Sequence, residues 1–206
     1  VREGERLLRA GEFHGWRSDM LLGSDLHGRV FGLIGMGRIG AATARRARGF
    51  GMQIRYTNRK PVAPALAAEL GAEFVSLDEL LRTADVLSVH CPLTPETHHL
   101  LNAERLAQLK PSAILINTAR GPVVDEAALA DALARGALRG AGLDVYEHAP
   151  RVHPALMDRD DVMLLPHLGS ATTETRAVMA ELALANCVAA LKGEPPKTPI
   201  PLPRSG

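Results

Sequence analysis

Apolar positions along the chain form short runs that alternate with segments in which Ala and Leu recur at helical spacing. The short runs predict strands over residues 30–34, 52–56, 73–75, 85–90, 113–117, 141–146 and 162–165. The helical spacing predicts helices over residues 2–9, from 38 onward, and over 62–70, 77–83, 102–109, 125–135 and 173–191. Strands that are apolar almost throughout, and that alternate with helices, predict an α/β fold, a doubly wound parallel sheet with helices on both faces.

The first predicted strand runs into Gly35-Met36-Gly37-Arg38-Ile39-Gly40, which has the G-x-G-x-x-G pattern. Between a strand and a helix this pattern favours a Rossmann dinucleotide-binding site over a glycine-rich structural turn. We expect Gly35 to make the tight turn, Gly37 to let the backbone approach a pyrophosphate, and Gly40 to allow close packing of the helix on the strand. The helix that starts near Arg38 points its free N–H groups and its positive dipole end at that anion.

Polar residues follow several of the later strands, and ligands of such sheets bind at the carboxyl ends of strands. Arg120 comes after the strand 113–117, where a guanidinium suits a substrate carboxylate and a carbonyl oxygen that gains charge. His167 follows the last strand, and an imidazole there can lend a proton to an alkoxide. Asp144 is suited to hold a nicotinamide carboxamide. The competing interpretations are a loop ion pair for Arg120, a structural histidine for His167 and a helix cap for Asp144.

The turn after the second strand reads Asn58-Arg59-Lys60, without the acidic residue that bonds the ribose 2′-hydroxyl of NAD in the Rossmann pattern. Arg59 and Lys60 can instead pair with a 2′-phosphate. We therefore expect NADP(H) in preference to NAD(H). The alternative is that both are ordinary solvated surface charges.

Composition narrows the class of protein. The 206-residue chain is 46% hydrophobic and carries a formal net charge of +1, which gives no electrostatic case for nucleic acid or membrane-surface binding. No apolar run approaches the roughly 18 residues of a membrane span. Its two cysteines favour a reducing, cytoplasmic environment. No metal site is expected.

Five motifs appear in the order typical of the D-isomer-specific 2-hydroxyacid dehydrogenases, and over about residues 20 to 193 the chain resembles that family. They are residues 35–40, 89–94, 117–121, 142–146 and 166–172. The turn 56–60 and the residues after His167 are most similar to glyoxylate/hydroxypyruvate reductases, or 2-ketogluconate reductases. The resemblance implies NAD(P)-dependent reduction of a small 2-oxo acid by a homodimer, with Arg120 binding substrate and His167 as acid/base. It further implies that Arg38, Ile39, Cys91, Thr118, Ala119 and Asp144 contact the cofactor. The whole expected cofactor set is Gly35, Gly37, Arg38, Ile39, Gly40, Asn58, Arg59, Lys60, Cys91, Pro92, Thr118, Ala119, Arg120, Asp144, His167 and Gly169.

One departure from the family concerns its third catalytic residue, a glutamate in a D-V-F-x-x-E-P pattern. Ala149 occupies that position here. In an extended segment Glu147 and Ala149 point to the same side, so one hypothesis is that Glu147 partly substitutes as a third catalytic residue. The rival is simple loss, which leaves a slow enzyme.

A second departure is the extent of the chain. We expect residues 1–20 to be a linker helix from a substrate domain, residues 21–170 the NAD(P)-binding domain, and residues 171–206 a helix and tail that return to the substrate domain. The chain then looks like a truncated or proteolysed reductase. A non-enzymatic nucleotide-sensing module, similar to the corepressors that share this fold, is the main alternative. An unrelated Rossmann enzyme, such as a hydrolase with tightly held NAD, lacks support from the Arg120 and His167 motifs.

Overall fold

The computed structural model describes residues 2–199, and the chain forms two compact units that meet in sequence between Pro166 and His167. The first unit contains a seven-stranded sheet in the order β3-β2-β1-β4-β5-β6-β7, and all neighbouring strands are parallel. Its strands are β1 (Val30–Ile34), β2 (Gln53–Thr57), β3 (Ala72–Phe74), β4 (Val86–Val89), β5 (Ile114–Asn117), β6 (Gly140–Leu143) and β7 (Val162–Leu164). This arrangement confirms the predicted doubly wound parallel sheet.

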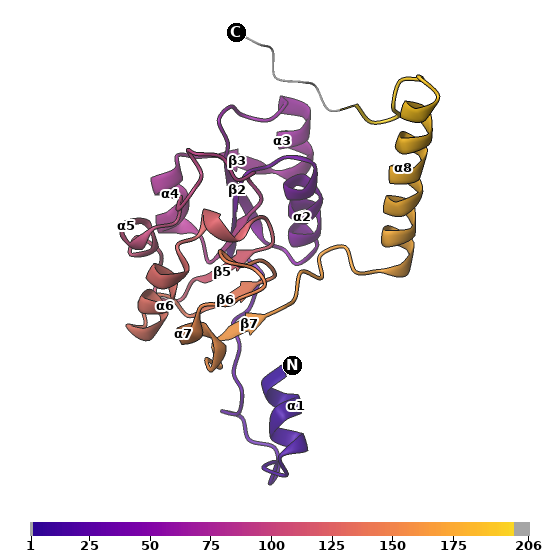
Figure 1. Ribbon diagram of the computed structural model, residues 1–206. Helices are drawn as coiled ribbons and strands as arrows, with labels where there is room; N and C mark the ends of the chain where they lie inside the picture. The colour runs from indigo at the N-terminus through magenta and orange to yellow at the C-terminus, as the bar shows by residue number, and fades with distance from the viewer. Residues whose placement is uncertain (1, 200–206) are drawn as a thin grey trace. The chain divides into compact units, whose positions relative to one another are not determined.

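Helices cover both faces of the sheet (Figure 1). One face carries α2 (Arg38–Gly49) and α3 (Pro64–Leu70), and the other carries α4 (Leu77–Thr83), α5 (Ala103–Leu106) and α6 (Glu126–Ala134). The remaining helices of this unit are α1 (Arg2–Arg9), the short 3-10 helix η1 (Gly121–Val123) and α7 (Pro154–Met157). The predicted alternation of strands and helices is therefore present.

The first strand shows why two separate cores form. Successive side chains of a strand point to opposite faces, so Phe31 and Leu33 join the apolar cluster under α2 and α3, whereas Ile34 joins the cluster under α4 to α6. Gly32 faces α4, where a Cβ atom would come within 2.9 Å of the Ala84 Cβ atom. The small residue lets that helix pack close to the sheet.

Several predicted bounds were wrong, each for a local reason. The strand predicted over 141–146 ends at Leu143, because Asp144 and Val145 form a bend. The helix predicted over 102–109 is α5 alone, with Asn102 as its N-cap. The helix predicted from residue 62 begins at Pro64, since proline is favoured in the first turn. Both α7 and η1 are too short for a periodic pattern to predict.

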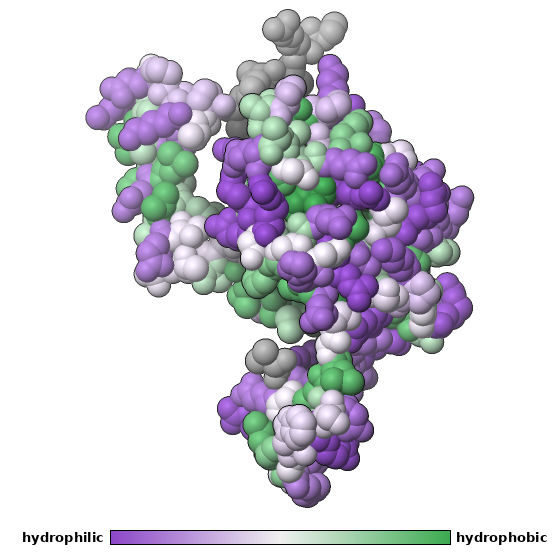
Figure 2. All heavy atoms as spheres, turned by 180° about the vertical axis from the view of Figure 1, so that it is seen from behind, coloured by the Kyte–Doolittle hydropathy of each residue, from purple (hydrophilic) through white to green (hydrophobic). Residues whose placement is uncertain are grey.

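The second unit consists of the residues from His167 onward, and its main element is α8 (Thr173–Leu191). The predicted bounds of this helix are confirmed, and Thr172 caps it by accepting from the Thr175 N–H at 3.1 Å. Figure 2 shows hydrophobic as well as hydrophilic residues along α8. Its exposed large apolar side chains are Val178, Met179, Leu182, Leu184, Val188 and Leu191. The predicted tail that follows this helix lies partly outside the described residues.

None of the helices within residues 2–199 combines the length and apolar character needed to cross a lipid bilayer.

Candidate functional site

The register of the parallel strands aligns their carboxyl ends in one row. Ile34 pairs with Val89, Val89 with Asn117, and Asn117 with Leu143. The residues that follow these strands therefore lie along one edge of the sheet. They include the Gly35–Gly40 loop, Cys91, the Arg120 loop and Asp144. The strand order reverses between β1 and β4, which is where open α/β sheets bind their ligands.

Two glycines of the β1–α2 loop, Gly35 and Gly40, lie where a side chain would collide with neighbouring backbone. Gly35 has φ +96°, and a Cβ atom there would lie 2.7 Å from the Cys91 nitrogen. A Cβ atom on Gly40 would lie 2.4 Å from the Gly35 carbonyl oxygen. Side chains are therefore excluded at both positions, and the loop, α2 and the end of β4 pack backbone against backbone.

Gly37 differs, because nothing lies within 4 Å of the place where its Cβ would be. It is the N-cap of α2 and so offers no side-chain oxygen to the first turn, which also contains no acidic residue. The N–H groups of Arg38 and Ile39 thus begin a helix whose positive end is open to an anion. Open space above a glycine at a helix N-terminus fits the pyrophosphate of a dinucleotide.

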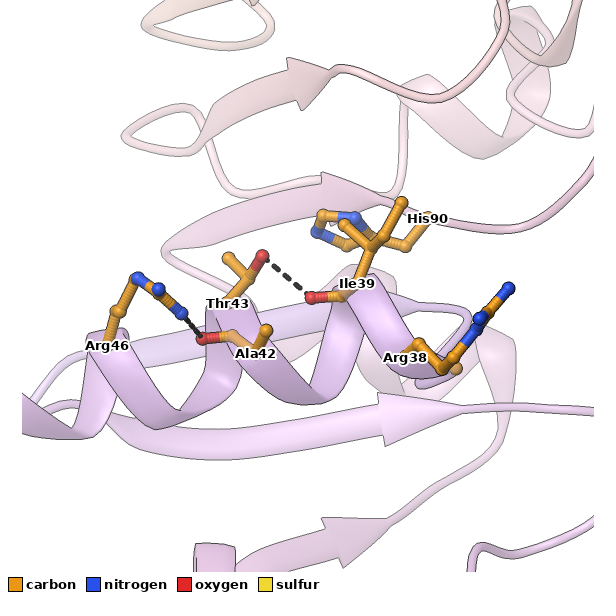
Figure 3. Close-up of a pocket in the computed structure, with 7 residues that line it drawn as sticks. Arg38, Ile39, Ala42, Thr43, Arg46 and His90 are labelled. Carbon is orange, nitrogen blue, oxygen red and sulfur yellow. Dashed lines mark hydrogen bonds between the residues drawn. The ribbon is translucent and has the colours of Figure 1, made fainter. Parts of the chain in front are cut away.

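A hollow of about 650 Å³ begins at this N-terminus and follows one side of α2 (Figure 3). Figure 3 shows Ile39 directed toward His90, while the Thr43 hydroxyl and the Arg46 guanidinium bond to carbonyl oxygens of their own helix. The His90 ring lies 3.0 Å from the Ser88 hydroxyl, and burial lowers the pKa of its imidazole. The sequence places His90 among the candidate residues that directly follow a strand, although it is not in the expected cofactor set.

The turn after β2 connects to the glycine loop through Asn58. Its side-chain oxygen accepts the Met36 N–H at 2.7 Å, so this residue holds the loop in shape. Arg59 and Lys60 are exposed, and Arg59 lies near enough to Glu96 to contribute to its lowered pKa, which arises chiefly from a hydrogen bond with Thr94. Two exposed cations therefore stand beside the strand end at which a Rossmann fold binds its adenosine ribose.

The loop after β5 places Arg120 at the sheet edge. The side chain of buried Asn117 donates to the Arg120 carbonyl oxygen at 3.0 Å and accepts from the Ala119 N–H at 3.1 Å. Both bonds fix the backbone while the Arg120 side chain is exposed, with its guanidinium donating to the Ala119 carbonyl at 2.6 Å. Thr118 is also exposed. The loop thus presents a cation on a rigid support.

Cys91 and Asp144 lie at the ends of β4 and β6. Burial raises the pKa of the Cys91 thiol, which makes it a packing residue beside Gly35 more than a reactive group. Asp144 is buried, and its N–H donates to the Asn117 carbonyl at 3.0 Å. Pro92 is exposed next to Cys91.

Glu147 is turned toward the interior of its unit. One carboxylate oxygen lies 2.7 Å from the His99 Nε2 atom, and the other accepts the Glu126 N–H at 3.3 Å. Burial alone would raise the pKa of this carboxyl, but the bonds from His99 and from the Glu126 backbone, together with His148, lower it. Ala149 is exposed. Both oxygens of Glu147 therefore have partners within its own unit.

His167 is the first residue of the second unit, and it is exposed with φ +57°. Few non-glycine residues adopt this left-handed conformation. Gly169 follows two residues later and is exposed. Arg120 and His167 thus belong to different compact units.

His98, His99 and Glu147 place ligand atoms within 4.8 Å of one another. The two imidazoles are stacked, with centroids 4.1 Å apart and planes inclined by 26°. Imidazole lone pairs lie in the ring plane, so nearly parallel rings this close cannot both direct one at the same ion. His99 and Glu147 belong instead to a hydrogen-bonding network with Glu126. Glu126 is buried, and no pattern in the sequence marks it as a member.

Residues 1–169 match the model of the D-isomer specific 2-hydroxyacid dehydrogenase, NAD binding domain. The glyoxylate reductase of Thermococcus onnurineus is 50% identical over 200 residues, which cover 95% of this chain and 60% of that protein. The glyoxylate reductase of Pyrococcus furiosus is 46% identical over 202 residues.

Solved structures of similar proteins have the same fold. A protein from Thermus thermophilus superposes with a TM-score of 0.90 at 48% identity, covering 98% of this chain and 63% of that one. A glyoxylate reductase from Paecilomyes thermophila gives a TM-score of 0.84 at 45% identity, covering 92% of this chain and 57% of that one. The chain spans about 60% of the length of the curated relatives it matches. With a strand order, a glycine loop and a family match that coincide, the chain belongs to the D-isomer specific 2-hydroxyacid dehydrogenase family and contains its NAD-binding domain.

Proposed function

We propose that this chain is the cofactor-binding part of an NADP(H)-dependent reductase, which converts a small 2-oxo acid of the glyoxylate type to the D-2-hydroxy acid. The observation that carries the proposal is the exposed Arg120 on a loop fixed by Asn117, at the same sheet edge as the glycine loop. The names of the glyoxylate reductases among the relatives support the choice of substrate class.

In the proposed reaction the carbonyl carbon gains a hydride and the carbonyl oxygen gains a proton. A reduced nicotinamide supplies the hydride when it is bound. Arg120 binds the substrate carboxylate through its fork of N–H donors and stabilises the negative charge that develops on the carbonyl oxygen. Because Arg120 needs only a carboxylate and a neighbouring carbonyl, hydroxypyruvate is included in the proposed substrate range.

His167 is the proposed proton donor, since an imidazole titrates near neutral pH and can give a proton to an alkoxide. Ala149 leaves the family's glutamate position without a carboxylate, and Glu147 has both oxygens in other bonds. We therefore favour a slow enzyme over one in which Glu147 replaces that glutamate.

The cofactor is proposed to bind with its pyrophosphate at the first turn of α2, above Gly37. Arg59 and Lys60 are proposed to pair with a 2′-phosphate, and Asp144 with the nicotinamide carboxamide. Cys91, Pro92, Thr118, Ala119 and Gly169 complete the proposed contacts. A homodimer is part of the proposal, and light scattering of the purified protein tests it.

The test is glyoxylate-dependent oxidation of NADPH with Arg120→Lys, Arg120→Gln and His167→Asn. Asn tolerates the left-handed conformation of His167, so that variant removes the imidazole without straining the backbone. We expect both Arg120 variants to lose at least about 100-fold in kcat/KM, with Lys retaining more than Gln. Equal activity of Arg120→Gln and the parent would remove Arg120 from the proposal.

A nucleotide-sensing module is the second candidate, and Ala149 favours it because the family's catalytic carboxylate is missing. This candidate predicts cofactor binding without oxidation of NADPH by glyoxylate. Turnover that depends on Arg120 excludes it.

A further inference from the structure

Glu126 is a buried carboxylate whose hydrogen bonds reach Glu147 and His153, which lie 21 and 27 positions further along the chain. It is only 5% exposed and stands in the first turn of α6. One of its oxygens accepts the Glu147 N–H at 2.5 Å, and the other accepts the His153 N–H at 3.2 Å. Since a buried carboxylate is costly unless it is hydrogen-bonded, these two bonds determine how residues 147–153 lie on α6.

The contact is reciprocal and extends to His99. The Glu126 N–H donates to one oxygen of Glu147, and the second oxygen of Glu147 lies 2.7 Å from the His99 Nε2 atom. His99 has φ +48°, a conformation that non-glycine residues keep only when their surroundings hold it. Its N–H donates to the Pro122 carbonyl oxygen at 2.8 Å. The network therefore links residues 147–153 to η1, which directly follows Arg120.

A second link runs through Gly121. A Cβ atom on this residue would lie 1.9 Å from the carbonyl carbon and oxygen of Tyr146 and 2.4 Å from the Glu147 nitrogen. Gly121 thus rests on the Tyr146–Glu147 peptide, whose N–H is the one bound by Glu126. Glu126 holds the peptide, the peptide supports Gly121, and Gly121 is the neighbour of Arg120.

We propose that Glu126 is a positioning residue for Arg120, acting through the Tyr146–Glu147 peptide and Gly121. The assignment of a substrate to Arg120 rests on the proposed function, whereas the mechanical link from Glu126 to residues 117–124 does not. Arg120 receives its orientation from two sides, from Asn117 on β5 and from Glu126 on α6.

The variant that tests this link is Glu126→Gln, which is nearly isosteric. An amide has one acceptor oxygen, so its NH2 group must face either the Glu147 N–H or the His153 N–H, where two donors oppose each other. Glu104→Gln is the matched control. Glu104 also lies in the first turn of a helix with a side-chain N-cap, α5, but it is exposed.

Amide hydrogen exchange is the first readout. We expect Glu126→Gln to accelerate exchange in residues 147–153 and also in residues 117–124. Within residues 2–199, the Glu126 carboxylate bonds the N–H groups of Glu147 and His153 and none in 117–124. Glu104→Gln should leave both segments unchanged. Unchanged exchange over 117–124 in Glu126→Gln would overturn the proposal, whether or not the protein reduces glyoxylate.

The second readout compares the KM for glyoxylate with the Kd for NADPH. A purely structural role of Glu126 would weaken the binding of substrate and of cofactor to the same extent. We expect the KM for glyoxylate to rise by about tenfold to a hundredfold, as for a displaced binding group. The Kd for NADPH should rise by clearly less, because most of the proposed cofactor contacts lie outside residues 117–124. Equal losses in both would overturn the positioning role. Faster exchange over 117–124 in a protein whose parent shows no turnover would uphold the link and contradict the proposed function alone.

Discussion

The two loops that form the candidate site are built by different means. The β1–α2 loop is a backbone structure in which Gly35 and Gly40 pack without side chains and Asn58 supplies one bond. The loop around Arg120 is held instead by side-chain amides and carboxylates from β5, α6 and the loop after β6, namely Asn117, Glu126 and Glu147. Backbone packing leaves a short local pattern in the sequence. A network of distant side chains does not.

The largest expected effect is a loss of stability from substituting Gly121, the residue after Arg120. Gly121→Ala places a Cβ atom on the Tyr146 carbonyl group, and we expect the free energy of unfolding to fall by about 3 kcal/mol or more, since backbone on both sides must shift. Urea denaturation measures the loss. Gly142→Ala is the control, because nothing lies within 4 Å of that Cβ position, and a similar loss there would contradict the packing argument.

Substitutions at Gly40 and Gly37 in the glycine loop should differ in their effect on stability. Gly40→Ala meets the Gly35 carbonyl oxygen, so we expect a loss of about 2 kcal/mol in thermal or urea unfolding. Gly37→Ala meets nothing and should cost less than about 1 kcal/mol. Equal destabilisation by the two substitutions would mean that the loop has no space reserved for a ligand.

The sequence predicted the glycine loop because strand, turn and helix signals lie within eighteen residues, 30–47. It also identified Arg120 as a residue that follows an apolar strand. It did not predict that Glu126, His99 and Glu147 meet, because their contacts join residues that are 21 to 48 positions apart. Nor did it predict that Glu147 is bonded inside the Rossmann unit, since the direction of a side chain in a loop depends on such contacts.

A smaller effect is expected at Asn58, which joins the turn after β2 to the glycine loop. Asn58→Ala removes the acceptor of the Met36 N–H, which we expect to cost about 1 kcal/mol and to weaken dinucleotide binding. Asn58→Asp retains an acceptor at that position and serves as the control in urea denaturation. If Asn58→Asp were as unstable as Asn58→Ala, the hydrogen bond would not be the cause.

The smallest expected effect is the pH dependence of stability that arises from Glu147. The pKa of Glu147 is lowered in the folded chain, so its contribution to stability is present above about pH 4.5, the range of an unfolded Glu. It is lost as the pH falls through the lowered pKa. Glu147→Gln should therefore flatten the decrease in stability below about pH 4.5, measured by urea denaturation at a series of pH values. An equally steep decrease in the variant would assign the acid sensitivity to other carboxyls.

The most direct test of the proposed cofactor site is a fluorescence titration of the protein and of Gly37→Ala with NADPH and NADH. We expect the protein to bind both, and to bind NADPH more tightly than NADH. Gly37→Ala should weaken both by at least about tenfold while remaining folded. A folded protein that binds neither dinucleotide, or a Gly37→Ala variant that binds as tightly as the parent, would contradict the placement of the cofactor at the first turn of α2.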